Sequence, residues 1–134
     1  MMFVDACAII AVLSKEPEAE RISQVLASAP APITSSVAVL EVVLSLSRPD
    51  KLNRPIHAIE NLVLDFLAER GVVIKDMPPA SEATKLAISA ADRYRTGRHG
   101  LNLGDCLHYA CAKHYAVPIL ATANEFKQTD LETA

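Results

Sequence analysis

The sequence predicts an α/β fold in which a central parallel sheet of four to five strands lies between layers of helices. Short apolar runs alternate at least four times with longer segments of helical periodicity, a pattern typical of β-α-β units. Hydrophobic residues make up 51% of the chain, whereas aromatic residues make up 4%, which indicates a core of Val, Ile, Leu and Ala. A chain of 134 residues can bury one such core. We therefore expect a single domain over residues 1–134.

In the first half of the chain, each predicted strand leads into a helix. The predicted elements are a strand over residues 2–4, helices over 6–13 and 17–29, a strand over 33–34 and a helix over 37–46. The first strand stops at Asp5, which therefore lies where a strand hands over to a helix. Ser35 or Ser36 is the expected N-cap of the last of these helices. That helix is apolar nearly all round, so we expect it to be buried, and Glu41 is its only charge.

The second half of the chain repeats the alternation after a polar loop over residues 47–55. The predicted elements are a helix through residues 59–67 that ends near Gly71, a strand over 72–74, a helix through 83–94, a helix that begins at Gly104 and a strand over 117–121. Asp105 falls in the first turn of its helix. An acid there is ordinarily a cap or a partner of the helix dipole, and that interpretation stays open beside a functional one.

Composition restricts the functional classes. The formal net charge of −3 gives the chain no overall positive field toward nucleic acid or acidic lipid. The N-terminal apolar run is broken by charges, so we expect neither a signal peptide nor a membrane span. Three cysteines, at positions 7, 106 and 111, match no zinc-binding spacing and are expected to be reduced core residues. We therefore expect a soluble, cytoplasmic protein.

Acidic residues follow several of the predicted strands. Asp5 comes directly after the first strand, Glu41 lies in the helix after the second, and Asp105 begins a later helix. Asn124 and Glu125 follow the last strand. Because ligands bind outside the carboxyl ends of parallel strands, these side chains can reach one site. A buried, unpaired Glu41 would cost several kcal/mol, so it should face a partner, a cation or a water-filled cleft unless it reaches the surface at the edge of its helix.

Oxygen ligands without His or Cys describe a site for a hard cation, Mg²⁺ or Mn²⁺. Such an ion can polarise a phosphoryl group and supply hydroxide, which predicts a nuclease. No phosphate-binding glycine motif is present. An aspartyl phosphatase with Asp5 as nucleophile stays possible, although Cys7 stands where a second acid would be expected. A nucleophilic pair of Cys106 with His108 or His114 is less favoured than surface or hydrogen-bonded core histidines.

A basic segment over residues 92–100 precedes the helix of Asp105. It carries Arg93, Arg95, Arg98 and His99 and is the one candidate for a phosphate-contacting surface. A solvated face is the alternative interpretation of such a charge run.

Four segments resemble PIN-domain ribonucleases of the VapC toxin type. They are Met2-Phe3-Val4-Asp5-Ala6-Cys7-Ala8-Ile9-Ile10-Ala11, Ser36-Val37-Ala38-Val39-Leu40-Glu41, Gly97-Arg98-His99-Gly100-Leu101-Asn102-Leu103-Gly104-Asp105-Cys106 and, near the end, Thr129-Asp130-Leu131. The resemblance covers essentially the whole chain and implies a PIN-like α/β/α fold. It also implies an Mg²⁺- or Mn²⁺-dependent endoribonuclease that cleaves structured RNA such as tRNA or rRNA. By this resemblance Asp5, Glu41 and Asp105 are the catalytic, metal-binding acids, and the basic segment is expected to contact RNA.

The same resemblance implies partners, and this chain differs from the usual family pattern at two places. A VapB-type antitoxin is expected to inhibit the protein, in a toxin–antitoxin hetero-oligomer, and a homodimer is expected as well. The family commonly has Thr-Ser after the first Asp, where this chain has Ala6 and Cys7. The fourth acid is usually Asp, where this chain offers Asn124 or Glu125. These departures keep open an alternative, a catalytically silent PIN fold that acts by binding an antitoxin.

Overall fold

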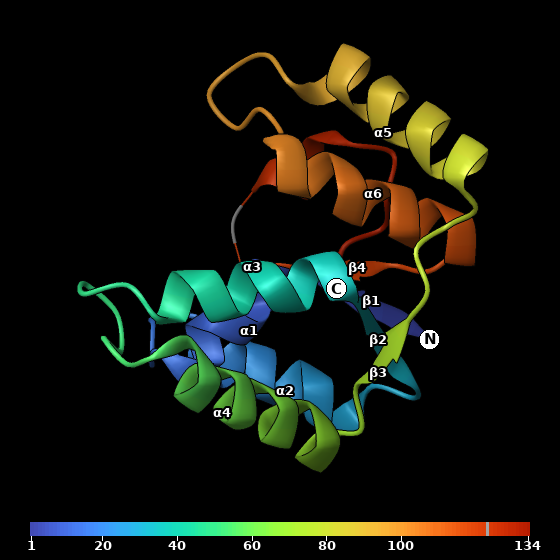
Figure 1. Cartoon of the computed structure of the whole chain (residues 1–134). Helices are drawn as coiled ribbons and strands as arrows, with labels where there is room; N and C mark the ends of the chain where they lie inside the picture. Colours follow the sequence, from blue (N-terminus) through green and yellow to red (C-terminus); the bar gives the residue numbers. More distant parts are fainter. Residues whose placement is uncertain (123) are drawn as a thin grey trace.

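The centre of the structure, a computed structural model that describes residues 1–122 and 124–134, is a parallel sheet (Figure 1). Its strands are β1 (Met2–Val4), β2 (Pro32–Ser35), β3 (Val73–Lys75) and β4 (Ile119–Leu120), in the spatial order β3-β2-β1-β4. Phe3 lies opposite Ile33 on one side and Ile119 on the other. An isolated parallel bridge joins Ile119 to Thr133. The predicted α/β fold with a parallel sheet is confirmed, with four strands in the described residues.

Helices cover the sheet on both faces. In chain order they are α1 (Ala6–Leu13), α2 (Ala19–Ser28), α3 (Ser36–Leu46), α4 (Ile56–Glu69), α5 (Ala80–Tyr94), α6 (Leu103–Tyr115) and the short 3₁₀ helix η1 (Glu125–Gln128). Helices α5 and α6 lie together on one side of the molecule, α2 and α4 lie on the other, and α1 and α3 lie between them (Figure 1). The chain therefore forms an α/β/α arrangement.

Polar side chains fix where three of the helices begin. Asp5 caps α1, Ser35 caps α3 by accepting from the Ala38 N–H at 3.2 Å, and Asn102 caps α6. A side chain that accepts from a free N–H in the first turn satisfies a group that the helix itself leaves unpaired. Two of these caps, Asp5 and Asn102, lie at the edge of the sheet where the acidic residues gather.

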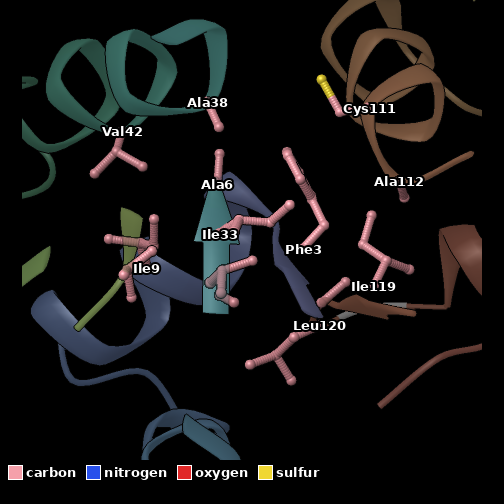
Figure 2. Packing of buried hydrophobic residues seen from close by; sticks show 14 of the residues in the cluster. Phe3, Ala6, Ile9, Ile33, Ala38, Val42, Cys111, Ala112, Ile119 and Leu120 are labelled. Atoms are coloured by element: carbon pink, nitrogen blue, oxygen red, sulfur yellow. The ribbon is translucent and has the colours of Figure 1, made fainter. Parts of the chain in front are cut away.

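The hydrophobic core fills the space between the sheet and the helices. Phe3 reaches from β1 into the gap between α3 and α6, near Ala38 and Cys111, whereas Leu120 points toward the opposite face (Figure 2). Phe3 and Leu120 are both buried. Because side chains alternate along a strand, β1 and β4 contribute to both apolar layers. The core consists mostly of Val, Ile, Leu and Ala, as predicted, but its largest fully buried side chains are the aromatic Tyr109, Phe3 and Phe126.

Two apolar elements are more exposed than their sequences indicate. Helix α3 was expected to be buried all round, but Leu40 is 58% and Leu44 is 48% exposed. Strand β3 is an edge strand, and its Val73 and Ile74 are 51% and 42% exposed. Apolar residues all round a helix do not show whether every face is buried. One face can pack in the core while another stays exposed to solvent.

The cysteines are free thiols, with Cys106 and Cys111 buried and Cys7 partly buried. Among the described residues, no helix combines the length and apolar character needed to cross a membrane.

Candidate active site

Asp5 is buried at the end of β1, with only 2% of its surface exposed. Its N–H donates to the carbonyl of Leu120 on β4 at 3.0 Å, which ties it to the neighbouring strand. Its Oδ2 accepts from the Cys7 N–H at 3.1 Å and caps α1. Its Oδ1 is buried and has no hydrogen-bond partner in the described residues. A buried oxygen without a partner is costly, so Asp5 is suited to a cation or donor that comes from outside the chain.

Asp105 is part of a capping box at the start of α6. Its N–H donates to Asn102 Oδ1 at 2.8 Å, and its Oδ2 accepts from the Asn102 N–H at 3.1 Å. The helix therefore begins at Leu103, one residue before the predicted start. Burial, together with the negative charges of Asp5 and Glu125, raises the pKa of Asp105 to about 6. The capping interpretation of Asp105 is thus confirmed. Its acidic environment is compatible with the functional interpretation, which stays a prediction.

Glu41 reaches from α3 to the buried side chain of His108 on α6. His108 Nε2 lies 2.9 Å from Glu41 Oε2 and 3.7 Å from Asp5 Oδ1, and the imidazole is 0% exposed. Because Nε2 faces two carboxylates, it must carry the hydrogen. Burial alone lowers the pKa of His108, but the hydrogen bond to Glu41 and the charges of both acids outweigh burial and raise it. His108 therefore links Glu41 of α3 to Asp5 at the end of β1.

Gly104 leaves room for the carboxylate of Glu41. A Cβ atom at this position would collide with Glu41 Oε1. The absence of a side chain at Gly104 therefore lets Glu41 approach the start of α6 closely.

The acids line one cavity of about 330 Å³, which we call the acidic cavity. Its lining residues are Asp5, Cys7, Ile10, Glu41, Ser45, Arg48, Asn102, Asp105 and Glu125. Four of the five predicted metal-binding residues are thus on one surface. The fifth, Asn124, lines a separate hollow with Arg21 and Lys127.

Two residues of this region were not predicted from the sequence. Arg48, which is exposed and 2.8 Å from Asp50, brings a positive charge to the acidic cavity. His108 stands three residues after Asp105, a spacing that places two side chains on one face of a helix and could have revealed it. No comparable signal marks Arg48 within its polar loop.

The donors of the acidic cavity suit a hard cation that keeps much of its water. In residues 1–122 and 124–134, no group of three or more His, Cys, Asp or Glu side chains stands ready to hold a metal ion. Mg²⁺ ordinarily takes one or two carboxylates and retains several waters, so it does not need such a group. The unpartnered Asp5 Oδ1 and the crowded negative charge around Asp105 fit an ion of this kind. Binding of Mg²⁺ or Mn²⁺ stays a prediction.

The predicted RNA-contacting residues are exposed but lie outside the acidic cavity. The guanidinium of Arg93 lies 4.8 Å from the ring centre of Tyr94 and 3.9 Å from Asp130. Arg95 lines a hollow between α5 and α6, and the backbone carbonyl of His99 accepts from the side chain of Gln128. Arg93 is therefore engaged within the fold, whereas Arg98 is directed to solvent with the rest of the turn.

Thiol chemistry is poorly supported at this site. Burial raises the pKa of Cys106 and, to about 11, that of Cys111. Burial and the charge of Asp5 also raise the pKa of Cys7, which lines the acidic cavity. A thiol with a raised pKa holds little thiolate at neutral pH, so none of the three is prepared as a nucleophile.

Comparison with known sequences gives matches over nearly the whole chain. A family model described as PIN domain matches residues 2–131. Ribonuclease VapC36 of Mycobacterium tuberculosis is 36% identical over 135 residues, which cover 98% of this chain and 91% of that protein. Ribonuclease VapC of Mycolicibacterium smegmatis is 32% identical over 132 residues, 97% of each chain.

Comparison with solved structures gives the same fold. The Mycobacterium tuberculosis toxin VapC20, described as sarcin-ricin loop cleaving, matches with a TM-score of 0.78 at 14% identity over 100% of this chain and 98% of that one. VapBC2 of Rickettsia felis, bound to a promoter DNA fragment, matches with a TM-score of 0.68 at 16% identity over 100% and 98%. At such identities the likeness concerns the fold alone.

Proposed function

The chain belongs to the PIN domain family, among the VapC ribonucleases, and from this premise we propose that it is an endoribonuclease toxin that hydrolyses structured RNA with Mg²⁺ or Mn²⁺. The acidic cavity is proposed as the catalytic centre. Asp5, Glu41, Asp105 and Glu125 would hold the cation there, one or two of them directly and the others through its bound water. The proposed substrate is tRNA or rRNA.

One observation carries this proposal. Side chains from the end of β1, from α3, from the start of α6 and from η1 meet around one cavity. The most buried of them, Asp5, has an oxygen without a hydrogen-bond partner among the described residues. Gathering like charges lowers stability unless a cation neutralises them. An arrangement that costs stability and brings together residues from four places in the chain is more consistent with a site than with packing.

Each residue has a distinct part in the proposed reaction. A divalent cation bound here supplies Lewis-acid polarisation of the phosphodiester and a nucleophile from water at neutral pH. Asp5 and Asp105 are fixed by their capping hydrogen bonds, so their carboxylates enter the reaction already oriented. Arg48 offers a guanidinium at the edge of the same cavity, where it can bind a phosphate group of the RNA.

A VapB-type antitoxin is the proposed partner. Several of the structural neighbours are VapBC toxin–antitoxin complexes, which supports this assignment. The chain also exposes a suitable surface, which we call the apolar patch: a hollow of about 350 Å³ between α3 and α4, bordered by Leu40, Ile56, Leu64 and Ile74. Each of these four side chains is at least 41% exposed. An apolar segment of the antitoxin would cover it.

Inhibition follows if the antitoxin also reaches the acidic cavity. A guanidinium from its tail could take the place of the cation against Asp5, Glu41 and Asp105. Asparagine or glutamine at these positions should then weaken antitoxin binding, whereas unchanged affinity would place the tail elsewhere. A homodimer of the toxin stays a prediction beside the toxin–antitoxin complex.

The deciding experiment is cleavage of purified tRNA and rRNA by antitoxin-free protein in Mg²⁺, in Mn²⁺ and in EDTA. Asp5→Asn and Asp105→Asn should each lower cleavage by about three orders of magnitude, since they remove charge and keep the side-chain volume. Asp65→Asn, at an exposed position on α4, is the matched control and should cleave like the wild type. Folded protein that cuts no RNA with either metal, yet binds the antitoxin, would instead establish the silent binding module.

The fourth metal-binding residue can be tested separately. Glu125 lines the acidic cavity and Asn124 does not, so Glu125→Gln should raise the Mg²⁺ concentration needed for half-maximal cleavage. Asn124→Asp should leave it unchanged. A lower Mg²⁺ requirement in Asn124→Asp would show that this position contributes after all.

A further inference from the structure

We propose that His108 is a positioning residue of the active site, which holds Glu41 in place for the cation through its Nε2–H. This inference rests on the proposed function and deepens it. His108 touches neither the RNA nor the cation in this scheme, and it acts through the carboxylate that it orients.

The contacts of His108 point to this role. Its Nε2 lies 2.9 Å from Glu41 Oε2, a hydrogen-bond distance, and 3.7 Å from Asp5 Oδ1. Glu41 itself is a long side chain on the surface of α3, with 39% of it exposed. A flexible carboxylate of this kind loses several rotamers when it is held for a ligand, and a fixed donor reduces that cost in advance.

The alternative, that His108 is only a core residue, accounts for less. A histidine retained for packing alone would ordinarily have both ring nitrogens satisfied, because buried polar atoms without partners are costly. Here Nδ1 is buried with no hydrogen-bond partner in the described residues, and only the nitrogen that faces the acids is used. The ring is fixed from behind by Phe3, whose ring centre lies 5.9 Å away. Nδ1 thus stays without a hydrogen bond, whereas Nε2 faces Glu41 and Asp5, two acids that line the acidic cavity.

Gly104 completes this arrangement. His108 brings Glu41 toward α6, and Gly104 provides the space that the carboxylate then occupies, because any side chain at that position would collide with Glu41 Oε1. Donor and space lie one turn apart on the same helix. Helix α6 therefore supplies one acid of the site, Asp105, and orients a second acid that belongs to α3.

The test measures Mn²⁺ affinity by calorimetry, apart from any RNA cleavage. His108→Leu removes the donor and keeps an apolar side chain of similar size beside Phe3, and we expect Mn²⁺ to bind about 10- to 100-fold more weakly. His108→Gln places an amide N–H near the position of Nε2 and should recover most of the affinity. In cleavage assays kcat should fall in His108→Leu, while KM for RNA stays near that of the wild type.

The matched control is His114, on the same helix and also hydrogen-bonded to a glutamate, Glu82, at 2.9 Å. His114→Leu and His114→Gln should leave Mn²⁺ affinity unchanged. Because a defect in folding would lower the thermal midpoint of His108→Leu, the comparison with His108→Gln decides: a folded Gln variant that loses Mn²⁺ as completely as the Leu variant overturns the inference. Unchanged or tighter Mn²⁺ binding in His108→Leu also overturns it.

The experiments distinguish a failure of the proposed function from a failure of the role of His108. Wild-type protein that neither binds Mn²⁺ nor cleaves RNA would overturn the proposed function, and this inference with it. Wild-type protein that binds Mn²⁺, with Asp105→Asn impaired and both His108 variants normal, would overturn only the role of His108.

Discussion

Two aspartates next to α6 have opposite surroundings: Asp105 lies in its first turn, and Asp130, from the segment after η1, packs against its second half. Asp105, at the start of the helix, is partly buried beside other acids, and its pKa is raised to about 6. Asp130 accepts hydrogen bonds from Lys113 Nζ at 2.9 Å and from the hydroxyl of Tyr109 at 2.7 Å, which lower its pKa to about 2. Ionisation of a carboxylate is therefore costly at Asp105, at the start of α6, and favoured at Asp130, beside Tyr109 and Lys113 of the same helix.

The two aspartates differ in whether the fold supplies donors for the charged carboxylate. Asp130 joins the segment after β4 to α6, and the donors of Lys113 and Tyr109 complete its environment. Among the described residues, Asp105 accepts a capping hydrogen bond from Asn102 and lies near Asp5 and Glu125. Burial and these negative charges outweigh that hydrogen bond and the charge of His108. An acid in the second situation is the more useful indicator of a site.

Exchanging charge for a neutral amide at each position should give the largest contrast. Asp105→Asn should lower the rate of RNA cleavage by about three orders of magnitude, since it removes about 4 kcal/mol of electrostatic stabilisation of the transition state. Asp130→Asn should cleave RNA like the wild type but lose about 1 kcal/mol of stability, a value reduced because the side chain is partly exposed. Single-turnover cleavage and urea unfolding measure the two effects. Equal loss of activity in both variants would remove the distinction.

Gly104→Ala should give an intermediate effect. The added methyl group collides with Glu41 Oε1, so cleavage should fall about 10- to 100-fold, while the helix itself gains from the change. In a Glu41→Gln background the additional loss should be much smaller, because the displaced group has already lost its charge. An additive double mutant would show that Gly104 acts independently of Glu41.

The stability of metal-free protein should depend on pH in opposite directions through the two aspartates. The folded state binds the proton of Asp105 more tightly than the unfolded chain does. Protonation of Asp105 therefore adds to the free energy of unfolding. This stabilisation is fully present below the usual pKa of 3.8 and is lost as the pH rises through about 6. The contribution of Asp130 is present above 3.8 and is lost as the pH falls through about 2.

Thermal unfolding from about pH 3 to pH 7 tests this in wild type and Asp105→Asn. We expect the wild type to lose on the order of 2 kcal/mol relative to the variant across the upper part of this range. Parallel pH curves for the two proteins would mean that Asp105 has no raised pKa in the metal-free state.

The smallest expected effect concerns the basic segment. Arg93 lies near Asp130 and Tyr94, whereas Arg98 has no comparable contact among the described residues. Arg98→Gln should therefore reduce the slope of log binding constant against log salt by about 1 for RNA, and Arg93→Gln should reduce it less. An unaltered slope in Arg98→Gln would return this segment to the interpretation of a solvated face.

The sequence predicts the convergence of the acids for a simple physical reason. Asp5 follows β1, Glu41 follows β2 along α3, and Glu125 follows β4, so parallel pairing brings these residues to one edge of the sheet. The alternation of strands and helices, with apolar residues at each, was sufficient to place them. Their closeness requires no knowledge of side-chain packing.

Finer features depend on packing that a linear pattern does not contain. Asn124 and Glu125 are adjacent, and only the direction of the short helix η1 decides which one lines the acidic cavity. The unsatisfied Nδ1 of His108 and the space at Gly104 are properties of helix contacts between α3 and α6. The exposure of Leu40 and Leu44 on α3 could not be predicted either, because the sequence pattern of an apolar helix face is the same whether that face is buried or exposed.

The apolar patch between α3 and α4 has a consequence for the handling of the protein. Ile74 belongs both to the patch and to β3, an edge strand of three residues that ends in Lys75, so exposed apolar side chains lie beside open backbone hydrogen-bonding groups. Such a surface favours self-association at high concentration. Solubility, rather than folding, should therefore limit the yield of the isolated chain, and Leu40→Lys should raise the concentration at which it precipitates.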